Sequence, residues 1–443
     1  MAELTIATGQ NWWRPQPQAV PARAVREGSN VAFFSLVAFT IILLLAPQSF
    51  FPILKAVRIA FLAAGIAALV HVFDATATRR PLVGSSSEMA IALALLTWAV
   101  MTTPFSMWLG GSVKLLTDQY VKTFVFFGLI GTLVTTKDRL RTLAWALAFC
   151  AIPLAAMAVE HFLSGDFLNT GTSIRRISGY TGLSGNPNDL ALTLNMLIPI
   201  AGVLLFTTRS AIGRVVAGVT LLLATCAVIL TFSRAGFVTL GTIAVLALIS
   251  LARRRAAGIA ALVVVGALAV TPMLPVGYID RLSTIADIQS DPTGSAQGRW
   301  KDFHVAVGVV AAHPILGVGL GQDILALNEA RGRATWRSVH NAYLEYAVDL
   351  GLPGLALFVW LLVASFMSAR AVKRRTANDP DAYELNVFAL GVQIALAAFA
   401  VAAFFHPIAY QFYLFCVAGL AVALKNAYRS DALARLAVQD HAS

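Results

Sequence analysis

The chain has 443 residues, of which 58% are hydrophobic and only 12% are charged. Because soluble domains carry about 25% charged residues, this composition excludes an ordinary soluble protein and indicates a helical membrane protein with several spans. The long apolar runs do not alternate, which argues against a β-barrel. The net charge of +11 is explained by basic cytoplasmic loops, so we expect no nucleic-acid partner.

A membrane-spanning helix needs about 20 mostly apolar residues, and runs of this kind predict an all-α polytopic fold with about twelve transmembrane helices. In chain order the predicted spans are 30–47, 53–73, 87–104, 118–135, 140–163, 187–207, 212–232, 235–252, 257–275, 343–367, 384–405 and 409–427. The second span is unusual because it contains Lys55 and Arg58.

Basic clusters fall on alternate connections between these spans, and both chain ends belong to the basic set. Cytoplasmic loops are enriched in Lys and Arg, so we predict cytoplasmic tails at 1–29 and 428–443. Between the tails we predict nine spans over 30–275, a large loop at 276–342 and three spans over 343–427. The opposite side of the membrane then carries the large loop and a medium loop at 164–186.

Charged residues are scarce on this opposite side, so each one is informative. Arg234 lies between two apolar runs, where an arginine is costly unless it faces water, a partner or an anion. Arg299 lies in the large loop, and Arg175 and Arg176 form a pair in the medium loop. Each could be a snorkelling or solvated charge. Together they predict a site for a phosphate-bearing ligand, because guanidinium is always charged and offers a planar fork of donors.

His340 lies at the end of the large loop, just before the tenth span. A lone histidine is more often packed or solvated, but a neutral imidazole here could accept a proton near neutral pH. Glu345 lies about one helical turn further on and could orient His340 or bond to a neighbouring helix. His304 and His313 lack metal-ligand spacing with a carboxylate cluster, so we predict no metal and no cofactor.

The medium loop ends at a predicted helix start. Either Asn186 or Ser184 is a suitable N-cap, with Pro187 in the first helical turn. A helix start by itself explains much of this segment. The N–H groups at such a start would also suit an anionic ligand.

Five short motifs occur in a fixed order between about residues 180 and 360 and carry a family resemblance. They are Gly185-Asn186-Pro187-Asn188-Asp189, Ser233-Arg234-Ala235-Gly236, Gly298-Arg299-Trp300, His313-Pro314-Ile315-Leu316-Gly317-Val318-Gly319 and His340-Asn341-Ala342-Tyr343-Leu344-Glu345. With the span layout and the single large loop, they resemble the bacterial O-antigen ligase and polymerase superfamily. The likeness is greatest to the O-antigen ligase of lipopolysaccharide synthesis, and it implies a fold like the GT-C glycosyltransferases.

The resemblance also implies substrates and a location. Members use undecaprenyl-pyrophosphate-linked glycans at the periplasmic face of the bacterial inner membrane, among its lipids. A ligase transfers the glycan to the lipid A–core oligosaccharide, a polymerase to another lipid-linked repeat, and a third branch to protein hydroxyls. Two arginines and a histidine are implicated in ligases, and Arg234, Arg299 and His340 match those positions.

We therefore expect an inverting, metal-independent O-antigen ligase with an arginine clamp for pyrophosphate and His340 as the base. Substrate binding is assigned to six further residues: Arg175, Arg176, Asn186, Asn188, Tyr343 and Glu345. The single large loop favours a ligase. The arginine pair of the medium loop is also consistent with a polymerase, and the protein O-oligosaccharyltransferase branch is a further alternative. From another class, a membrane transporter would place its ionisable groups near the bilayer midplane, whereas here they gather at one surface.

Overall fold

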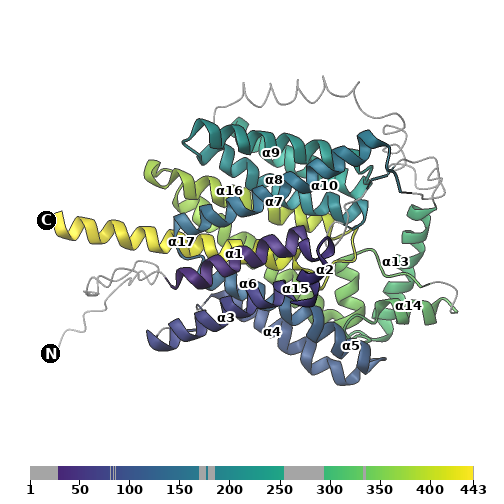
Figure 1. The fold of residues 1–443 in the computed structure, drawn as a ribbon. Coiled ribbons are helices and arrows are strands. Elements are labelled where there is room, and N and C mark those ends of the chain that lie inside the picture. Colours follow the sequence, from purple (N-terminus) through teal and green to yellow (C-terminus); the bar gives the residue numbers. More distant parts are fainter. Residues whose placement is uncertain are drawn as a thin grey trace, which may run out of the picture.

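The computed structural model describes residues 28–79, 81–82, 84, 86–168, 176–177, 185–253, 294–332 and 336–442. Within these ranges every regular element is a helix (Figure 1). The predicted ninth span at 257–275, the start of the large loop, Ser184 and Arg175 lie outside the described residues.

Helices lie within the predicted apolar runs that the structure describes, although the second predicted span, 53–73, is divided between two helices. In chain order they are α1 (Asn30–Leu45), α2 (Pro52–Ala56), α3 (Ile59–Ala77), α4 (Ser87–Thr102), α5 (Leu109–Leu115), α6 (Val121–Leu133), α7 (Lys137–Ser164), α8 (Pro187–Thr207), α9 (Ala211–Leu230), α10 (Arg234–Arg253), α13 (Ser295–Ala312), α14 (Asp323–Ala330), α15 (Ala342–Arg375), α16 (Tyr383–Ala402) and α17 (Phe412–Ala442). A π-helical segment, Leu116–Tyr120, runs directly into α6, and short 3-10 turns lie at Pro47–Ser49, Thr103–Phe105 and Pro380–Ala382.

Eight of the described helices are long and apolar enough to cross a membrane, namely α3, α4, α7, α8, α9, α10, α15 and α16. The apolar helix α1 is shorter, with 16 residues. The protein is therefore a multi-pass helical membrane protein, and the number of twelve spans stays a prediction.

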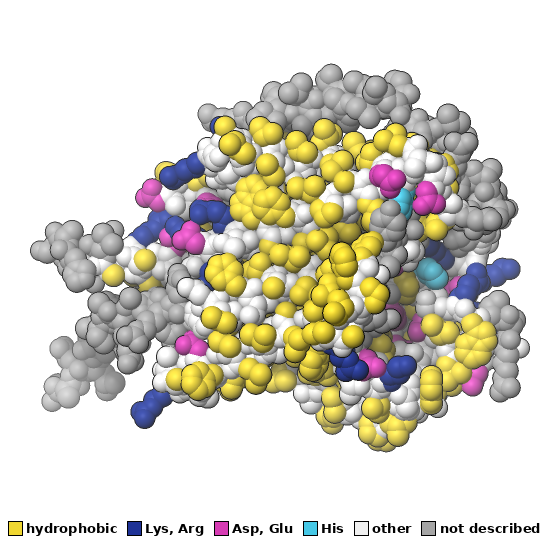
Figure 2. Space-filling view, in the orientation of Figure 1, with side chains coloured by type: hydrophobic (Ala, Val, Ile, Leu, Met, Phe, Trp, Pro, Cys, Tyr) yellow, Lys and Arg dark blue, Asp and Glu magenta, His cyan; other side chains and the backbone are white. Residues whose placement is uncertain are grey.

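The bundle has two distinct ends. Helix α1 begins and α17 ends at one of them (Figure 1). The turns after α1, α4, α9 and α16 lie at the other end, together with α13 and α14 from the large loop. Hydrophobic side chains cover the middle of the bundle, and charged side chains gather toward its ends (Figure 2). This distribution is the one that a bilayer around the middle would require.

Burial separates central helices from peripheral ones. In α8 and α16, 78% of the apolar window is buried inside the protein, against 11% in α3 and 22% in α10. Helix α8 packs against α7, α9, α10 and α16, whereas α3 packs mainly on α1 and α6. The exposed aromatic and aliphatic side chains of α3, such as Phe61 and Phe73, therefore face the region that lipid would fill.

Ion pairs fasten the end of the bundle where α17 finishes. Lys425 of α17 lies 2.6 Å from the fully buried carboxylate of Glu88 at the start of α4. Arg141 of α7 pairs with Glu384 of α16, with 2.5 Å between the charged atoms. A buried carboxylate is stable only when paired, so Lys425 and Glu88 hold α17 and α4 in register.

A glycine-rich segment of the large loop packs backbone to backbone against a break in α15. At Gly351, φ is 70° and the helix is interrupted. There, Leu352 N donates to Pro314 O at 2.8 Å and Gly319 N to Asp349 O at 3.0 Å. A Cβ on Gly351 would lie 2.1 Å from Ile315 O. Close packing and a left-handed backbone explain why these positions are glycines. The same contacts hold the large loop over the start of α15.

Candidate active site

The start of α8 presents Asn188 toward the loops of one bundle end. Asn186 is the N-cap, and its Oδ1 accepts from Asn188 N at 2.9 Å and Asp189 N at 3.0 Å. This confirms Asn186 as a cap, with Pro187 at the first helical position, as the sequence predicts. Because the cap fixes the first turn, the direction of the Asn188 side chain is fixed as well.

Asn188 joins three segments that are far apart in the sequence. Its Oδ1 accepts hydrogen bonds from Ser233 Oγ at 2.7 Å and from Arg176 Nη2 at 2.9 Å. Its main-chain oxygen lies 3.3 Å from Nε2 of His406. The medium loop, the start of α10 and the α16–α17 connection therefore meet at Asn188.

The Ser233–Gly236 motif brings Arg234 to this meeting point. Ser233 Oγ accepts from Gly236 N at 3.1 Å and so caps the first turn of α10. A Cβ on Gly236 would lie 2.6 Å from Cβ of Ala191 in α8, so only glycine allows this close approach. Asn195 adds a buried bond from its Nδ2 to Gly236 O at 2.9 Å. The half-buried Arg234, the first residue of α10, is thus held beside the start of α8.

Helix α13 supplies Arg299 from the large loop. The preceding Gly298 lies against the guanidinium of Arg337, since a Cβ there would be 2.6 Å from Arg337 Nη1. One turn on, buried Asp302 pairs with Arg331 at 2.5 Å and with Arg337 at 3.4 Å. These pairs fix α13 against the segment that leads to His340.

His340 has the protonation state that a base requires. Its Nδ1 lies 3.0 Å from Ser338 O, and a carbonyl can only accept, so Nδ1 carries the proton and Nε2 keeps its lone pair. Burial lowers the pKa of His340, and the positive charge of Arg299 lowers that pKa further. The ring is therefore neutral near pH 7, and Arg299 is close enough to act on it.

His406, which the sequence analysis did not single out, belongs to the same cluster. It is buried, and its Nδ1 lies 2.9 Å from Ala402 O. Burial lowers its pKa to about 4, with a smaller contribution from the positive charge of Arg299. Its signal in the sequence is a histidine in a short turn between two apolar spans, on the side that carries the other candidates.

Tyr343 and Glu345 support this turn from α15. The Tyr343 hydroxyl donates to Ala400 O at 2.8 Å, and Glu345 Oε2 accepts from Ala409 N at 3.0 Å. Of the two roles considered for Glu345, the structure therefore gives it a bond to a neighbouring segment. Contact of either residue with substrate stays a prediction.

The structure thus gathers three arginines and two histidines at one end of the bundle: Arg176, Arg234, Arg299, His340 and His406. Within the described ranges, no group of three or more His, Cys, Asp or Glu could hold a metal ion. Such a site can bind a strongly anionic group and accept one proton beside it.

Residues 219–359, which include Arg234, Arg299 and His340, match the family model described as O-antigen ligase. This match supports the O-antigen ligase superfamily as the family of this chain. Members of this superfamily are glycosyltransferase-like enzymes, either ligases or polymerases, and the family implies a lipid-linked glycan as substrate in a membrane setting. A comparison with curated proteins finds no match.

Proposed function

We propose that this protein is an O-antigen ligase that transfers a glycan from undecaprenyl pyrophosphate to the lipid A–core oligosaccharide. The observation that carries the proposal is the proximity of Arg299 to His340, since the charge of Arg299 lowers the pKa of His340. A cation for the leaving pyrophosphate and a neutral base for the acceptor are the two groups that glycosyl transfer between such lipids needs.

In the proposed reaction, the acceptor hydroxyl oxygen attacks C1 of the first sugar from the face opposite the pyrophosphate. As the new C1–O bond forms, Nε2 of His340 takes the hydroxyl proton. The bond from C1 to the pyrophosphate oxygen breaks, and its electron pair stays on the pyrophosphate. Arg234 and Arg299 stabilise that charge. Attack from the opposite face inverts the configuration at C1.

The remaining site residues would shape the donor pocket. Arg176, held by Asn188 at 2.9 Å, lies where it could contact the glycan or the second phosphate. Asn188 would position Arg176 and Ser233 together, and through Ser233 the start of α10. Arg175, Asn186, Tyr343 and Glu345 complete the proposed substrate-binding set.

The proposed site uses arginines in place of a divalent ion. Purified protein should therefore keep its transfer activity in excess chelator. Loss of activity in chelator, restored only by a divalent ion, would show that this part of the mechanism is wrong.

The proposed setting is the bacterial inner membrane, with the site facing the periplasm and both termini in the cytoplasm. Two observations support it: α1 begins and α17 ends at the bundle end opposite the site (Figure 1), and basic clusters belong to that same set of connections. Labelling of single cysteines placed in the 208–210 turn and in the exposed segment near His313 would test this orientation.

The central experiment uses cells that lack their own ligase, with lipopolysaccharide resolved on a gel. The unmutated protein should restore long-chain lipopolysaccharide, and His340→Ala should leave only lipid A–core. His313→Ala is the matched control, because His313 is exposed and lies in the same loop. Equal restoration by the His340 and His313 variants would remove His340 from the mechanism.

A polymerase is the second candidate, because Arg176 of the medium loop lies in the cluster and polymerases more often use two arginine-bearing loops. The two activities differ in their acceptor. Purified protein given only lipid-linked repeat units should leave them unextended if it is a ligase. Growth of longer lipid-linked chains in that mixture would favour the polymerase.

A further inference from the structure

A second surface feature lies apart from the arginine and histidine cluster. A groove of about 750 Å³ is lined by residues of α1, α2, α3 and α6, by the turns on either side of α2, by the π-helical segment before α6, and by Phe412 at the start of α17. Pockets of about 300–1,000 Å³ are the usual size for small ligands or parts of lipids. We call this feature the α3 groove.

The wall of the α3 groove consists mainly of small and apolar side chains, which suit a hydrocarbon chain. Ala60, Ala64 and Ala68 recur every four residues, so they lie on one face of α3, and Gly65 joins them in the lining. These small side chains leave a shallow channel along the helix, and a Cβ on Gly65 would meet nothing within 4 Å. Phe39 and Leu43 of α1 form the facing apolar wall.

One end of the α3 groove is polar and carries more positive than negative charge. Arg58 and Lys122 line it, together with a single acidic residue, Asp118. Within the described part of the chain, neither cation has an ion-pair or side-chain hydrogen-bond partner. Gln48 also lines the groove, and its buried Oε1 has no hydrogen-bond partner among the described residues. A phosphate group would neutralise the cations, and a hydroxyl of the same ligand could satisfy Gln48.

Arg58 adopts an unfavourable backbone conformation, and a role for its side chain in the α3 groove explains why an arginine occupies this position. Arg58 has φ 53° and ψ 49°, the left-handed conformation, and it precedes α3 as its N-cap. Non-glycine residues outside the Asn and Asp group adopt this conformation rarely, because it costs about 1–2 kcal/mol per residue. A glycine or asparagine would make the turn more easily, so the turn alone does not explain an arginine there.

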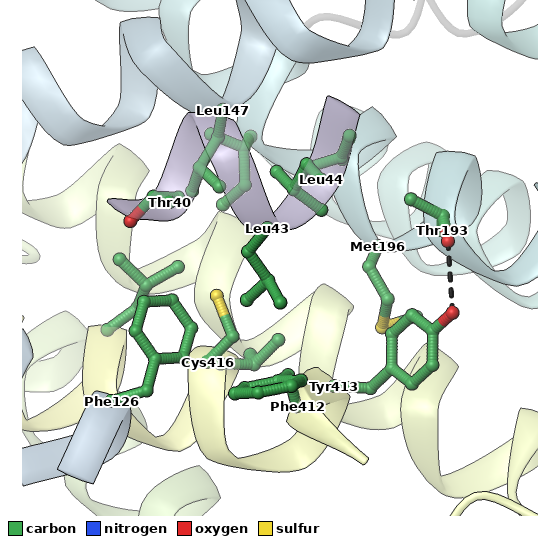
Figure 3. Close-up of a pocket in the computed structure, with 14 residues that line it drawn as sticks. Thr40, Leu43, Leu44, Phe126, Leu147, Thr193, Met196, Phe412, Tyr413 and Cys416 are labelled. Carbon is green, nitrogen blue, oxygen red and sulfur yellow. Dashed lines mark hydrogen bonds between the residues drawn. The ribbon is translucent and has the colours of Figure 1, made fainter. Parts of the chain in front are cut away.

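Next to the α3 groove lies a small apolar cavity of about 40 Å³ between α1, α6, α7, α8 and α17 (Figure 3). Leu43 and Phe412 line both spaces. The small cavity has too little volume for a lipid chain, so the chain in the α3 groove would run along α3.

The α3 groove and the catalytic cluster are built from different helices. Helix α3 packs on α1 and α6, whereas α10 packs on α8, α9 and α16, and α13 packs on α14 and α15. The pyrophosphate of the donor must lie at the reacting C1 carbon, beside Arg234 and Arg299. A phosphate at Arg58 and Lys122 therefore belongs to another lipid, one whose phosphate is distant from its reacting hydroxyl.

We propose that the α3 groove is the membrane anchor site for the acceptor, a phosphorylated glycolipid whose phosphate binds Arg58 and Lys122 while a hydrocarbon chain lies along α3. This inference rests on the proposed glycosyl transfer. The sugars of the anchored acceptor extend across the same bundle end to His340, and the presence of Arg58 in an otherwise apolar segment is explained by its role in a headgroup site.

The first test removes the two charges without altering the turn. Arg58→Asn combined with Lys122→Gln keeps a residue that tolerates the left-handed conformation and removes both cations. Loss of two charge-assisted contacts should raise the KM for the acceptor about tenfold or more, with the KM for the donor and kcat unchanged. Arg79→Asn is the matched control, because Arg79 also has a left-handed φ of 53° but lies at the other end of α3.

The second test fills the groove. Gly65→Leu adds a side chain where the structure is open, and should also raise the acceptor KM. Gly241→Leu in α10 is the control, since a Cβ there also meets nothing within 4 Å and Gly241 does not line the groove.

A binding measurement separates this inference from the proposed function. Purified protein in nanodiscs is titrated with lipid A–core, either phosphorylated or enzymatically dephosphorylated, with no donor present. Tighter binding of the phosphorylated form, lost in the double variant but kept in Arg79→Asn, supports the site even if no transfer is detected. Transfer with unchanged acceptor KM in both groove variants overturns the site and leaves the proposed function standing. A raised donor KM, or equal competition by an anionic phospholipid, also overturns it.

Discussion

The contact between α10 and α8 offers a sharp test of how Arg234 is positioned. In Gly236→Ala, the new Cβ would lie 2.6 Å from Cβ of Ala191 and 3.2 Å from Cβ of Ser233. Because carbon atoms pack at about 3.5–4.0 Å, the start of α10 must move away from α8 by about 1 Å. That movement also stretches the 2.9 Å bond from Asn195 to Gly236 O.

The expected consequence is a large loss of activity with a small loss of stability. Overpacking costs about 1–3 kcal/mol, and alanine returns about 1 kcal/mol through its higher helix propensity. A displacement of about 1 Å at a catalytic group can lower the rate about a hundredfold. We therefore expect kcat/KM for glycan transfer to fall about a hundredfold in Gly236→Ala, while the melting temperature in detergent shifts by only a few degrees.

Gly241→Ala provides the comparison, because Gly241 lies on the same helix and a Cβ there has nothing within 4 Å. It should keep the activity of the unmutated protein and match or exceed its stability. If Gly236→Ala transfers glycan as fast as Gly241→Ala, then Arg234 does not depend on the close packing of α10 against α8, and the reasoning fails.

Four further predictions concern single interactions. The pKa of His340 is lowered by burial and by Arg299, so the neutral ring that the proposed mechanism requires should persist below pH 6.5, and activity should fall as the pH drops through this lowered value. Arg299→Gln removes a nearby positive charge and should move this acid limb to higher pH, besides lowering the rate; a pH–rate profile that keeps the same limb would contradict the pairing. Because His406 has a folded-state pKa of about 4 and an unfolded value of about 6.5, the unfolded state binds more protons between these values. Stability should therefore fall by about 3 kcal/mol as the pH drops from neutral toward 4, and melting curves of His406→Asn should show a weaker pH dependence; an unchanged pH dependence in this variant would contradict the lowered pKa. Asn188→Ala leaves Ser233 and Arg176 without the acceptor that they share and should lower kcat/KM at least about tenfold, whereas Asn386→Ala, which removes bonds to Lys373 O and Thr376 at the opposite bundle end, should affect stability alone; the two variants are compared by transfer assay and thermal melting. Lys425→Met leaves the buried Glu88 carboxylate without its cationic partner and should lower the free energy of unfolding by about 3–5 kcal/mol. The double variant Lys425→Met with Glu88→Leu should restore most of this loss. No recovery in the double variant would mean that the pair is not the source of the loss.

Local signals in the sequence selected many of the residues of the proposed site, whose roles stay predictions. Asn186 and Pro187 predicted the start of α8, and that start holds as predicted because capping depends on neighbours within one turn. Arg234, Arg299 and His340 were selected because charges are scarce on one side of the membrane, and the electrostatic effect of Arg299 on His340 places two of them together. His406 was missed, because its importance depends on contacts with Asn188 and Ala402 rather than on its own neighbours.

The glycines show the same division between local and distant causes. The run from Gly317 to Gly321 has the composition of a phosphate loop, yet in the folded chain Gly317 and Gly319 lie against the backbone of Asp349 and the side chain of Ser106. Both contacts are made with residues distant in sequence, so no motif could distinguish a ligand loop from a packing segment.

Composition and hydropathy by themselves determined that this is a multi-pass helical protein whose polar chemistry gathers outside the apolar runs. They could not tell interior helices from peripheral ones: α8 and α9 are equally apolar, yet 78% of the apolar window is buried in one and 28% in the other. The physical reason is that lipid and a neighbouring helix are almost equally apolar, so hydropathy does not discriminate between them. Which helices are central and which residues share a site depends on tertiary packing. That packing in turn depends on glycines such as Gly236 and on hydrogen bonds such as those of Asn188.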